Sequence, residues 1–425
     1  MSNTQKFNKK VLFISGPFSE LEDYINNDLE TPKGMPGVYK RLKYFAEKGW
    51  EVHWIVEGKT DRRFKKDGIN FYTYNPSFYI FKWLLNNLRL SRIIKIAFLL
   101  RFVKVFTLSL KVANEVKPDV IYGLKVAYAL PSYIVARKLN TVAIFVEFGT
   151  WMYRDFISSN FLRRIIRLPF FIGSIIAFNL PFDLFIMTND GTNGDKVFKY
   201  FKIPENKCLF LLNGVDKNPI QRTKENITYL RKKYNLPLDR KIILSVGRLV
   251  SWKRVDKVIK FFSSIKGYKY NLQLVIVGNG DQEVKLKEIV KEEELGDSVK
   301  FMGDLPHNDI FEIMALSDVY ISFYDLSNLS NTMLEAISSG LPIISLNDGS
   351  LSEVVTDGYN GILINSFDEK DRVIEMLSND EILERMSKAS YEIALKKLYT
   401  WDERMEKELK IVENLIEAKR KGYGR

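Results

Sequence analysis

Short apolar runs alternate with amphipathic stretches along the first half of the chain. The runs "KKVLFISG" at 9–16 and "WEVHWIVEG" at 50–58 are flanked by polar or turn residues. Between them, "GVYKRLKYFAEKG" at 37–49 has apolar residues at helical spacing and a Gly at its end. Three further runs with Asp or Gly punctuation continue the pattern at 117–123, 141–149 and 182–190. This alternation predicts an α/β fold with a parallel sheet covered by helices on both faces.

A second series of the same kind follows a polar, proline-containing stretch at 210–226. The expected strands lie within 241–250, 272–280, 299–305, 319–325 and 341–347, and the expected helices within 253–265, 282–295 and 307–316. A chain of 425 residues exceeds what one hydrophobic core usually organises. We therefore predict two doubly wound, Rossmann-like domains at 1–217 and 218–400 and a terminal amphipathic helix at 401–425. Ligands of such sheets bind at the carboxyl ends of the strands, so we expect a cleft there.

Few residues of the chain could hold a disulfide or a metal ion. Cys208 is the only cysteine, and His53 and His307 are the only histidines. This composition excludes a disulfide framework and a Cys/His metal cluster, and with no Asp-x-Asp motif we expect no metal site. The polar N-terminal leader passes into an apolar run of about five residues, which is too short for a signal peptide or a transmembrane helix. We therefore expect a cytoplasmic protein.

The net charge of +12 is concentrated in the first half of the chain. Residues 1–217 contain 33 Lys and Arg against 19 Asp and Glu, a difference of +14, while residues 218–425 contain 31 against 33, a difference of −2. No acidic residue occurs in 68–114, which contains seven basic residues: Lys82, Arg89, Arg92, Lys95, Arg101, Lys104 and Lys111. A second acid-free run at 156–182 carries Arg163, Arg164 and Arg167 beside large apolar residues.

These basic and apolar runs favour a peripheral position on the anionic inner face of a membrane. Each basic residue near such a surface contributes about 1 kcal/mol, and the apolar residues are suited to the interface. The alternative is that these helices cover the first sheet with their cations in solvent. Nucleic-acid binding is disfavoured because neither a ribonucleoprotein motif nor zinc-finger spacing is present.

Two motifs in the second half could bind an anion. In "SVGRLVSWKRVDKVI" at 245–259, a strand is expected to end at Val246, Gly247 allows a turn, and Arg248 and Lys253 follow at the mouth of the sheet. Two cations beside a strand end suit a diphosphate, although a loop Arg and Lys could also be merely solvated.

The second motif is "DLSNLSNTMLEAISSGLP" at 325–342. If its helix begins near Ser330 or Asn331, the first-turn N–H groups lack intrahelical partners and can bind an anion that the helix dipole also favours. The short polar side chains would then act as caps and leave room for phosphate oxygens. Glu335, one turn further in, could accept hydrogen bonds from ribose hydroxyls, or it could be an ordinary surface glutamate.

These motifs, together with "LNGVD" at 212–216, "VGNGD" at 277–281 and "SGLPIIS" at 339–345, resemble glycosyltransferase family 4, the retaining transferases of the GT-B fold. The resemblance runs from Val11 to about Trp401. It implies a GT-B architecture in which the first domain binds the acceptor, the second binds a nucleotide sugar, and the terminal helix packs back on the first domain.

The resemblance also implies roles for individual residues. Arg248 and Lys253 would hold the diphosphate, and Glu335 would hold the ribose. Backbone amides at Asn331 and Thr332 would meet the distal phosphate. Gly34 and Gly37 resemble the first-domain loop that comes close to the sugar phosphate.

The chain departs from the family pattern at two places. Ser327 and Asn328 stand where the family has its first glutamate and a following glycine, so sugar recognition is expected to use these side chains or backbone groups. The first domain also lacks the family's histidine near the reacting centre. Glu147, Thr150 and Trp151 are candidates in its place, while Arg154 and Asp155 are expected to form a structural pair.

We therefore expect a metal-independent, retaining hexosyltransferase of class EC 2.4 that needs no cofactor besides its nucleoside-diphosphate-sugar substrate. By family resemblance, the departing phosphate oxygen takes the acceptor proton, and fixed cations replace a metal. The expected acceptor is a polysaccharide, a glycolipid or a lipid-linked oligosaccharide. Two alternatives remain: a degenerate GT-B protein that binds a nucleotide sugar or a partner transferase without turnover, and a sugar-nucleotide epimerase, which the scarcity of histidines and cleft carboxylates disfavours.

Overall fold

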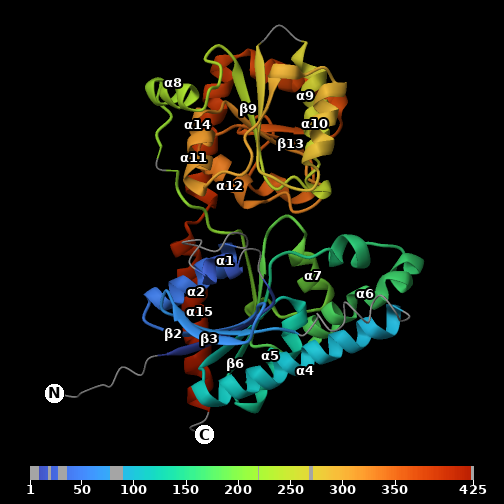
Figure 1. Ribbon diagram of the computed structural model, residues 1–425, viewed down its shortest axis with the longest axis vertical. Helices are drawn as coiled ribbons and strands as arrows, with labels where there is room; N and C mark the ends of the chain where they lie inside the picture. Colours follow the sequence, from blue (N-terminus) through green and yellow to red (C-terminus); the bar gives the residue numbers. More distant parts are fainter. Residues whose placement is uncertain are drawn as a thin grey trace, which may run out of the picture. The chain divides into compact units, whose positions relative to one another are not determined.

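The computed structural model describes residues 9–17, 21–26, 36–76, 90–218, 220–267 and 271–422, with only the backbone of Glu22 and of residues 90–99. The chain forms two units (Figure 1). Unit 1 contains residues up to 188, 194–211 and 402–425, and unit 2 contains 189–193 and 212–401. The crossover into unit 2 thus lies six residues before the expected boundary at 217, and a short loop at 189–193 also joins unit 2. The terminal helix belongs to unit 1.

Unit 1 is built on an eight-stranded sheet in the order β3-β4-β2-β1-β5-β6-β7-β8. The strands are β1 (Lys10–Ser15), β2 (Glu51–Glu57), β3 (Arg62–Lys66), β4 (Ile69–Tyr74), β5 (Val120–Leu124), β6 (Val142–Glu147), β7 (Leu184–Thr188) and β8 (Cys208–Leu211). All neighbouring strands pair in parallel except β3 and β4. The prediction of an entirely parallel sheet is wrong at this edge. Asp67 and Gly68 have φ values of 49° and 79°, and two successive residues in this region close a tight hairpin.

Helices cover both faces of the first sheet. They are α1 (Leu21–Ile25), α2 (Pro36–Glu47), α4 (Leu90–Val116), α5 (Val126–Lys138), α6 (Phe161–Asn179), α7 (Gly194–Tyr200) and α15 (Trp401–Gly422). Val11 and Phe13 of β1 pack with α2 and α15, whereas Leu12 and Ile14 pack with α4, α5 and α6. This alternation follows from the period-two geometry of a strand.

A buried ionic cluster joins α15 to the rest of unit 1. The Glu408 carboxylate accepts hydrogen bonds from Nε and Nη2 of Arg41 at 2.6 and 2.9 Å, from Tyr122 at 3.2 Å and from Arg404 at 3.4 Å. Glu408 and Arg41 are both fully buried. Gly37, which the resemblance assigns to a loop, instead lies buried in the first turn of α2, and its carbonyl accepts a hydrogen bond from Arg41 Nη1 at 2.7 Å. Gly34 lies outside the described residues.

Unit 2 has a six-stranded, fully parallel sheet in the order β11-β10-β9-β12-β13-β14. The strands are β9 (Lys241–Val246), β10 (Leu272–Val277), β11 (Val299–Phe301), β12 (Val319–Ser322), β13 (Ile343–Leu346) and β14 (Gly361–Ile364). This order is that of a doubly wound Rossmann sheet whose switch point lies between β9 and β12. Ligands of such sheets bind beyond the carboxyl ends of the strands at the switch point.

The helices of unit 2 form two layers. Helices α8 (Lys224–Lys233), α11 (His307–Leu316), α12 (Asn331–Ser338) and α14 (Asp380–Lys397) pack with Ile242, Leu244 and Val246 of β9. Helices α9 (Val255–Lys266), α10 (Glu283–Glu292) and α13 (Lys370–Ser378) pack with Ile243 on the other face. The predicted strands and helices of this half are present, and β14 is an additional strand.

Candidate active site

The carboxyl end of β9 meets β10 and β12 through close backbone and hydroxyl contacts. The carbonyl of Val246, the last residue of β9, accepts hydrogen bonds from the hydroxyls of Tyr324 at 2.9 Å and Thr332 at 3.3 Å. A Cβ on Gly278 would lie 2.2 Å from the carbonyl oxygen of Gly247, so only glycine fits where the β10 loop crosses the β9 loop. The start of α12 is therefore attached directly to the end of β9.

Lys253 is buried beside this junction. Its Nζ lies 3.5 Å from the ring centroid of Tyr324 and 4.5 Å from that of Trp252. Burial lowers the pKa of the Lys253 ammonium group, and the nearby charge of Arg248 lowers it further. Arg248 itself is exposed on the loop after Gly247. The structure thus brings the two predicted cations together, one exposed and one buried against aromatic rings.

Helix α12 begins as the sequence predicts. Ser330 is its N-cap and accepts a hydrogen bond from the Met333 amide at 3.3 Å. The Asn331 side chain accepts a hydrogen bond from Asn213 at 2.7 Å, and the Thr332 hydroxyl lies 3.1 Å from that of Tyr320. The amides of Asn331 and Thr332 have no hydrogen-bond partner among the described residues, and together with the helix dipole they could bind an anion.

Glu335 is buried, so the interpretation of Glu335 as an ordinary surface glutamate is wrong. Its Oε1 lies 3.0 Å from Nε2 of His307, the first residue of α11. Ligand atoms of Asp216, His307 and Glu335 lie within 4.8 Å of one another, a grouping that could hold a metal ion. The sequence did not predict this grouping because the three residues are far apart along the chain.

Ser327 and Asn328 both donate hydrogen bonds to carboxylates of the protein. The Ser327 hydroxyl donates to Oδ2 of Asp190 at 2.8 Å, and the Asn328 amide donates to Oδ2 of Asp348 at 2.8 Å. Ser327 has a φ of 60°, in the left-handed region that non-glycine residues seldom adopt. The Leu329 amide also donates to the Asp190 carbonyl at 3.1 Å. Asp190 therefore holds the turn that leads into α12.

Asp190 is itself a site residue that sequence reasoning missed. Its carboxylate accepts hydrogen bonds from the amide and hydroxyl of Thr192 at 3.2 and 2.6 Å, and burial raises its pKa. Its charge also partly offsets the effect of burial on the pKa of Lys253. In the sequence, Asp190 only follows an apolar run, a pattern that indicates a turn after a strand.

The first-domain candidates lie in unit 1. Glu147, at the end of β6, is buried and accepts hydrogen bonds from the amides of Val126 and Phe148 at 3.1 and 3.2 Å. Thr150 accepts a hydrogen bond from the Met152 amide at 3.1 Å, and Trp151 is exposed. Arg154 and Asp155 form the expected pair at 3.0 Å, and Arg167 joins Asp155 at 2.9 Å.

Comparison with known proteins places unit 2 in a family. Residues 226–393 match the family described as Glycosyl transferases group 1. Among sequence relatives, an uncharacterized glycosyltransferase of Methanocaldococcus jannaschii is 32% identical over 40% of this chain and 44% of its own length. N-acetyl-alpha-D-glucosaminyl L-malate synthase of Bacillus anthracis is 27% identical, with the same two coverages. The matched segments thus span less than half of these relatives.

Solved structures match almost the whole chain. HepE of Anabaena in complex with UDP and glucose has a TM-score of 0.66 at 16% identity and covers 95% of this chain and 100% of its own. WaaG, described as a glycosyltransferase involved in lipopolysaccharide biosynthesis, has a TM-score of 0.62 at 16% identity, with coverages of 93% and 98%. The chain therefore has the GT-B fold, and its residues 226–393 form a domain of the group 1 glycosyl transferases.

Proposed function

We propose that this protein is a retaining, metal-independent glycosyltransferase that takes its sugar from a nucleoside-diphosphate donor. The main support is the arrangement at the switch point of unit 2, where Lys253, Arg248 and the first turn of α12 surround one end of β9. Two cations and a set of free amides can neutralise the charge that develops on a leaving diphosphate. In this proposal Glu335 accepts hydrogen bonds from the ribose and takes no part in bond breaking.

The donor site can be tested by a thermal-shift screen with nucleoside diphosphates and their sugars, since a ligand stabilises the folded protein by mass action. We expect the nucleoside diphosphate with the preferred base to raise the melting temperature of the parent protein and to have little effect on that of a Lys253→Met variant. An equal shift in both proteins would place the diphosphate elsewhere.

A nucleotide-sugar-binding protein without turnover is the second candidate. It is favoured by the hydrogen bonds that Ser327 and Asn328 donate to carboxylates of the protein. These two side chains would have to rearrange before they could hydrogen-bond a sugar. Release of nucleoside diphosphate from a donor panel separates the candidates. A transferase releases it in the presence of acceptor, whereas a binding protein gives the thermal shift and no release.

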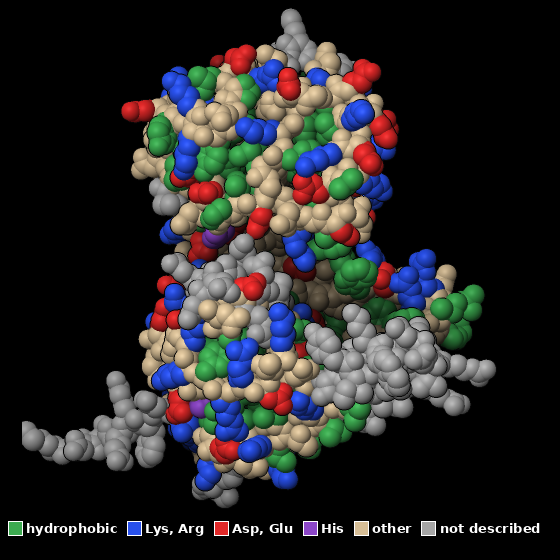
Figure 2. Space-filling view, in the orientation of Figure 1, with side chains coloured by type: hydrophobic (Ala, Val, Ile, Leu, Met, Phe, Trp, Pro, Cys, Tyr) green, Lys and Arg blue, Asp and Glu red, His purple; other side chains and the backbone are tan. Residues whose placement is uncertain are grey.

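We also propose a lipid-linked or glycolipid acceptor at an anionic membrane. Helix α6 exposes large apolar side chains beside Arg163, and Figure 2 shows hydrophobic and basic groups together at its outer end. The most exposed are Phe170 at 84%, Phe161 at 78% and Leu162 at 68%. Within the described ranges, no helix is both long enough and apolar enough to cross a bilayer. An amphipathic helix with these groups suits the interface.

Vesicle sedimentation tests this surface. We expect Leu162→Ser together with Phe170→Ser to reduce binding to phosphatidylglycerol vesicles, and the parent to bind phosphatidylcholine vesicles weakly. The matched control is Leu395→Ser, since Leu395 on α14 of unit 2 is 82% exposed. Equal sedimentation of all three proteins would contradict the proposal. The predicted residues Lys82 and Arg89 lie outside the described residues, and the side chains of Arg92 and Lys95 are not described.

A further inference from the structure

Unit 2 has a cavity at the amino-terminal ends of its strands, on the side of the sheet away from the candidate active site. Its volume is about 700 Å³, and its lining includes Lys241, the first residue of β9, and Asp318, which directly precedes β12. The nucleotide site lies beyond the other ends of these parallel strands. A six-residue strand spans about 20 Å, so the two sites are separated by the depth of the sheet.

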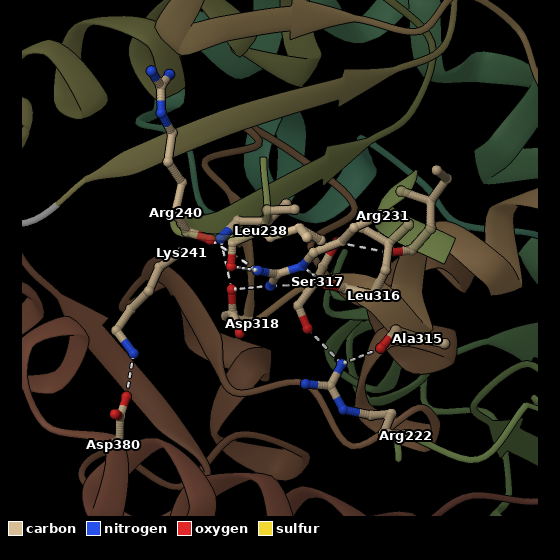
Figure 3. A network of polar contacts seen from close by, with 12 residues as sticks. Arg222, Arg231, Leu238, Arg240, Lys241, Ala315, Leu316, Ser317, Asp318 and Asp380 are labelled. Carbon is tan, nitrogen blue, oxygen red and sulfur yellow. Dashed lines mark hydrogen bonds and ion pairs between the residues drawn. The ribbon is translucent and has the colours of Figure 1, made fainter. Parts of the chain in front are cut away.

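Arg222 lines this cavity, and one of the three nitrogens of its guanidinium group makes hydrogen bonds to the described residues. Its Nη1 donates to the carbonyls of Met314, Ala315 and Ser317 at the C-terminal end of α11, at 3.0 and 3.2 Å for the first two. In Figure 3 these contacts leave from one nitrogen, and the other two nitrogens point away from them. Among the described residues, Nε and Nη2 have no hydrogen-bond partner. Together they form the edge of the guanidinium that presents two parallel N–H groups.

The other charged residues of the cavity lining are paired with each other or with neighbours. Lys241 pairs with Asp380, Lys388 pairs with Glu384 at 2.7 Å, and Asp318 pairs with Arg231 at 2.8 Å. Arg231 caps the same helix end through the Leu316 carbonyl (Figure 3). Arg222 is therefore the one cation of the described lining without a carboxylate partner. Burial lowers its pKa, and the Asp318 charge opposes that effect.

We propose that this cavity binds a small molecule carrying an oxyanion, a carboxylate or a phosphate group, on the Nε and Nη2 edge of Arg222. A planar guanidinium edge binds such a group through two parallel hydrogen bonds. Ile220, Leu383 and Tyr391 line the same cavity and provide apolar contacts for the body of the ligand. The site is independent of the proposed transferase activity, because none of its residues belongs to the nucleotide site.

Titration calorimetry with inorganic phosphate and with succinate, each against chloride at equal ionic strength, tests the proposal and distinguishes the two chemistries. Arg222→Lys keeps a cation for the α11 carbonyls and removes the two-donor edge, so we expect at least a tenfold loss of affinity. Gln221→Glu adds a carboxylate to the exposed lining without altering Arg222, and we expect a weaker loss. The matched control, Gln282→Glu, makes the same change away from this cavity and should bind like the parent.

Lys253→Met separates this cavity from the nucleotide site. Binding that persists in Lys253→Met and is lost in Arg222→Lys supports the proposal, and the preferred probe identifies the ligand class. Binding of neither probe above chloride would overturn it. Binding that is lost in Lys253→Met but unchanged in Arg222→Lys and Gln221→Glu would overturn it as well.

Discussion

Replacing Lys253 by methionine should separate its proposed role in catalysis from its contribution to folding. The Lys253 ammonium lies over the rings of Tyr324 and Trp252 and is buried. A cation over an aromatic ring is stabilised by about 0.5 to 2 kcal/mol. The pKa of Lys253 is nevertheless lowered, because burial destabilises the charged form by more than these contacts stabilise it. The charge is therefore retained at some cost to the folded state.

Methionine preserves most of the packing and removes the charge. Its unbranched side chain has a similar length, and its sulfur contacts aromatic rings favourably, by about 0.3 to 1.5 kcal/mol. We therefore expect the free energy of unfolding to change by no more than about 1 kcal/mol. Loss of a preorganised charge from a leaving diphosphate should cost about 3 to 4 kcal/mol in the transition state, which is about 10²- to 10³-fold in kcat.

The assay measures nucleoside diphosphate release at saturating donor, alongside urea denaturation of the same preparation. Lys257→Met is the control, because Lys257 lies one turn further along and pairs with Asp325 at 3.2 Å. We expect the control to keep its rate within about tenfold. The reasoning would be refuted by a Lys253→Met protein with the parent rate, or by one whose lost activity is accompanied by a loss of several kcal/mol in stability.

Three further predictions concern the pH dependence of Lys253, the buried cluster at Glu408 and the independence of transfer from metal ions. At pH values between the lowered pKa of Lys253 and its ordinary pKa of 10.5, the unfolded chain binds more protons than the folded one. The contribution of Lys253 to the free energy of unfolding should therefore rise with pH over this range. Diphosphate affinity should fall over the same range, and titrations of Lys253→Met should lack this alkaline decline. Glu408→Gln leaves Arg41 without its buried counter-charge and should cost about 3 to 5 kcal/mol in urea denaturation, whereas Glu413→Gln, which affects a part-exposed pair with Lys9, should cost less than about 1 kcal/mol. Transfer should persist in EDTA, and an EDTA-sensitive rate that is lost in Asp216→Asn would instead indicate a metal at the Asp216 and His307 grouping.

Local sequence patterns predicted the elements that position the site. The start of α12 at Asn331 follows from Ser330 as a cap, and the end of β9 at Val246 follows from an apolar run that stops at Gly247. The hairpin of β3 and β4 was missed although Asp67-Gly68 is a strong turn signal. Its flanking residues 62–66 are mostly charged, and an edge strand exposed to solvent lacks the apolar pattern of a buried one.

The missed site residues depend on tertiary contacts that no local pattern encodes. Asp190 contacts Ser327 across 137 positions of the sequence, and His307 contacts Glu335 across 28. The burial of Glu335 likewise depends on α11 packing beside α12. Spacing alone could identify Glu335 as a candidate, but it could not distinguish a solvated carboxylate from one held by a histidine.

The loop at 189–193 makes the two units inseparable by any single cut of the polypeptide. The backbone passes from one unit to the other after residues 188, 193, 211 and 401. A truncated protein that starts at residue 212 would lack Asp190 and would leave Ser327 in a left-handed conformation without the carboxylate that holds it. Transplanting unit 2 onto another scaffold would therefore require grafting this pentapeptide as a separate piece.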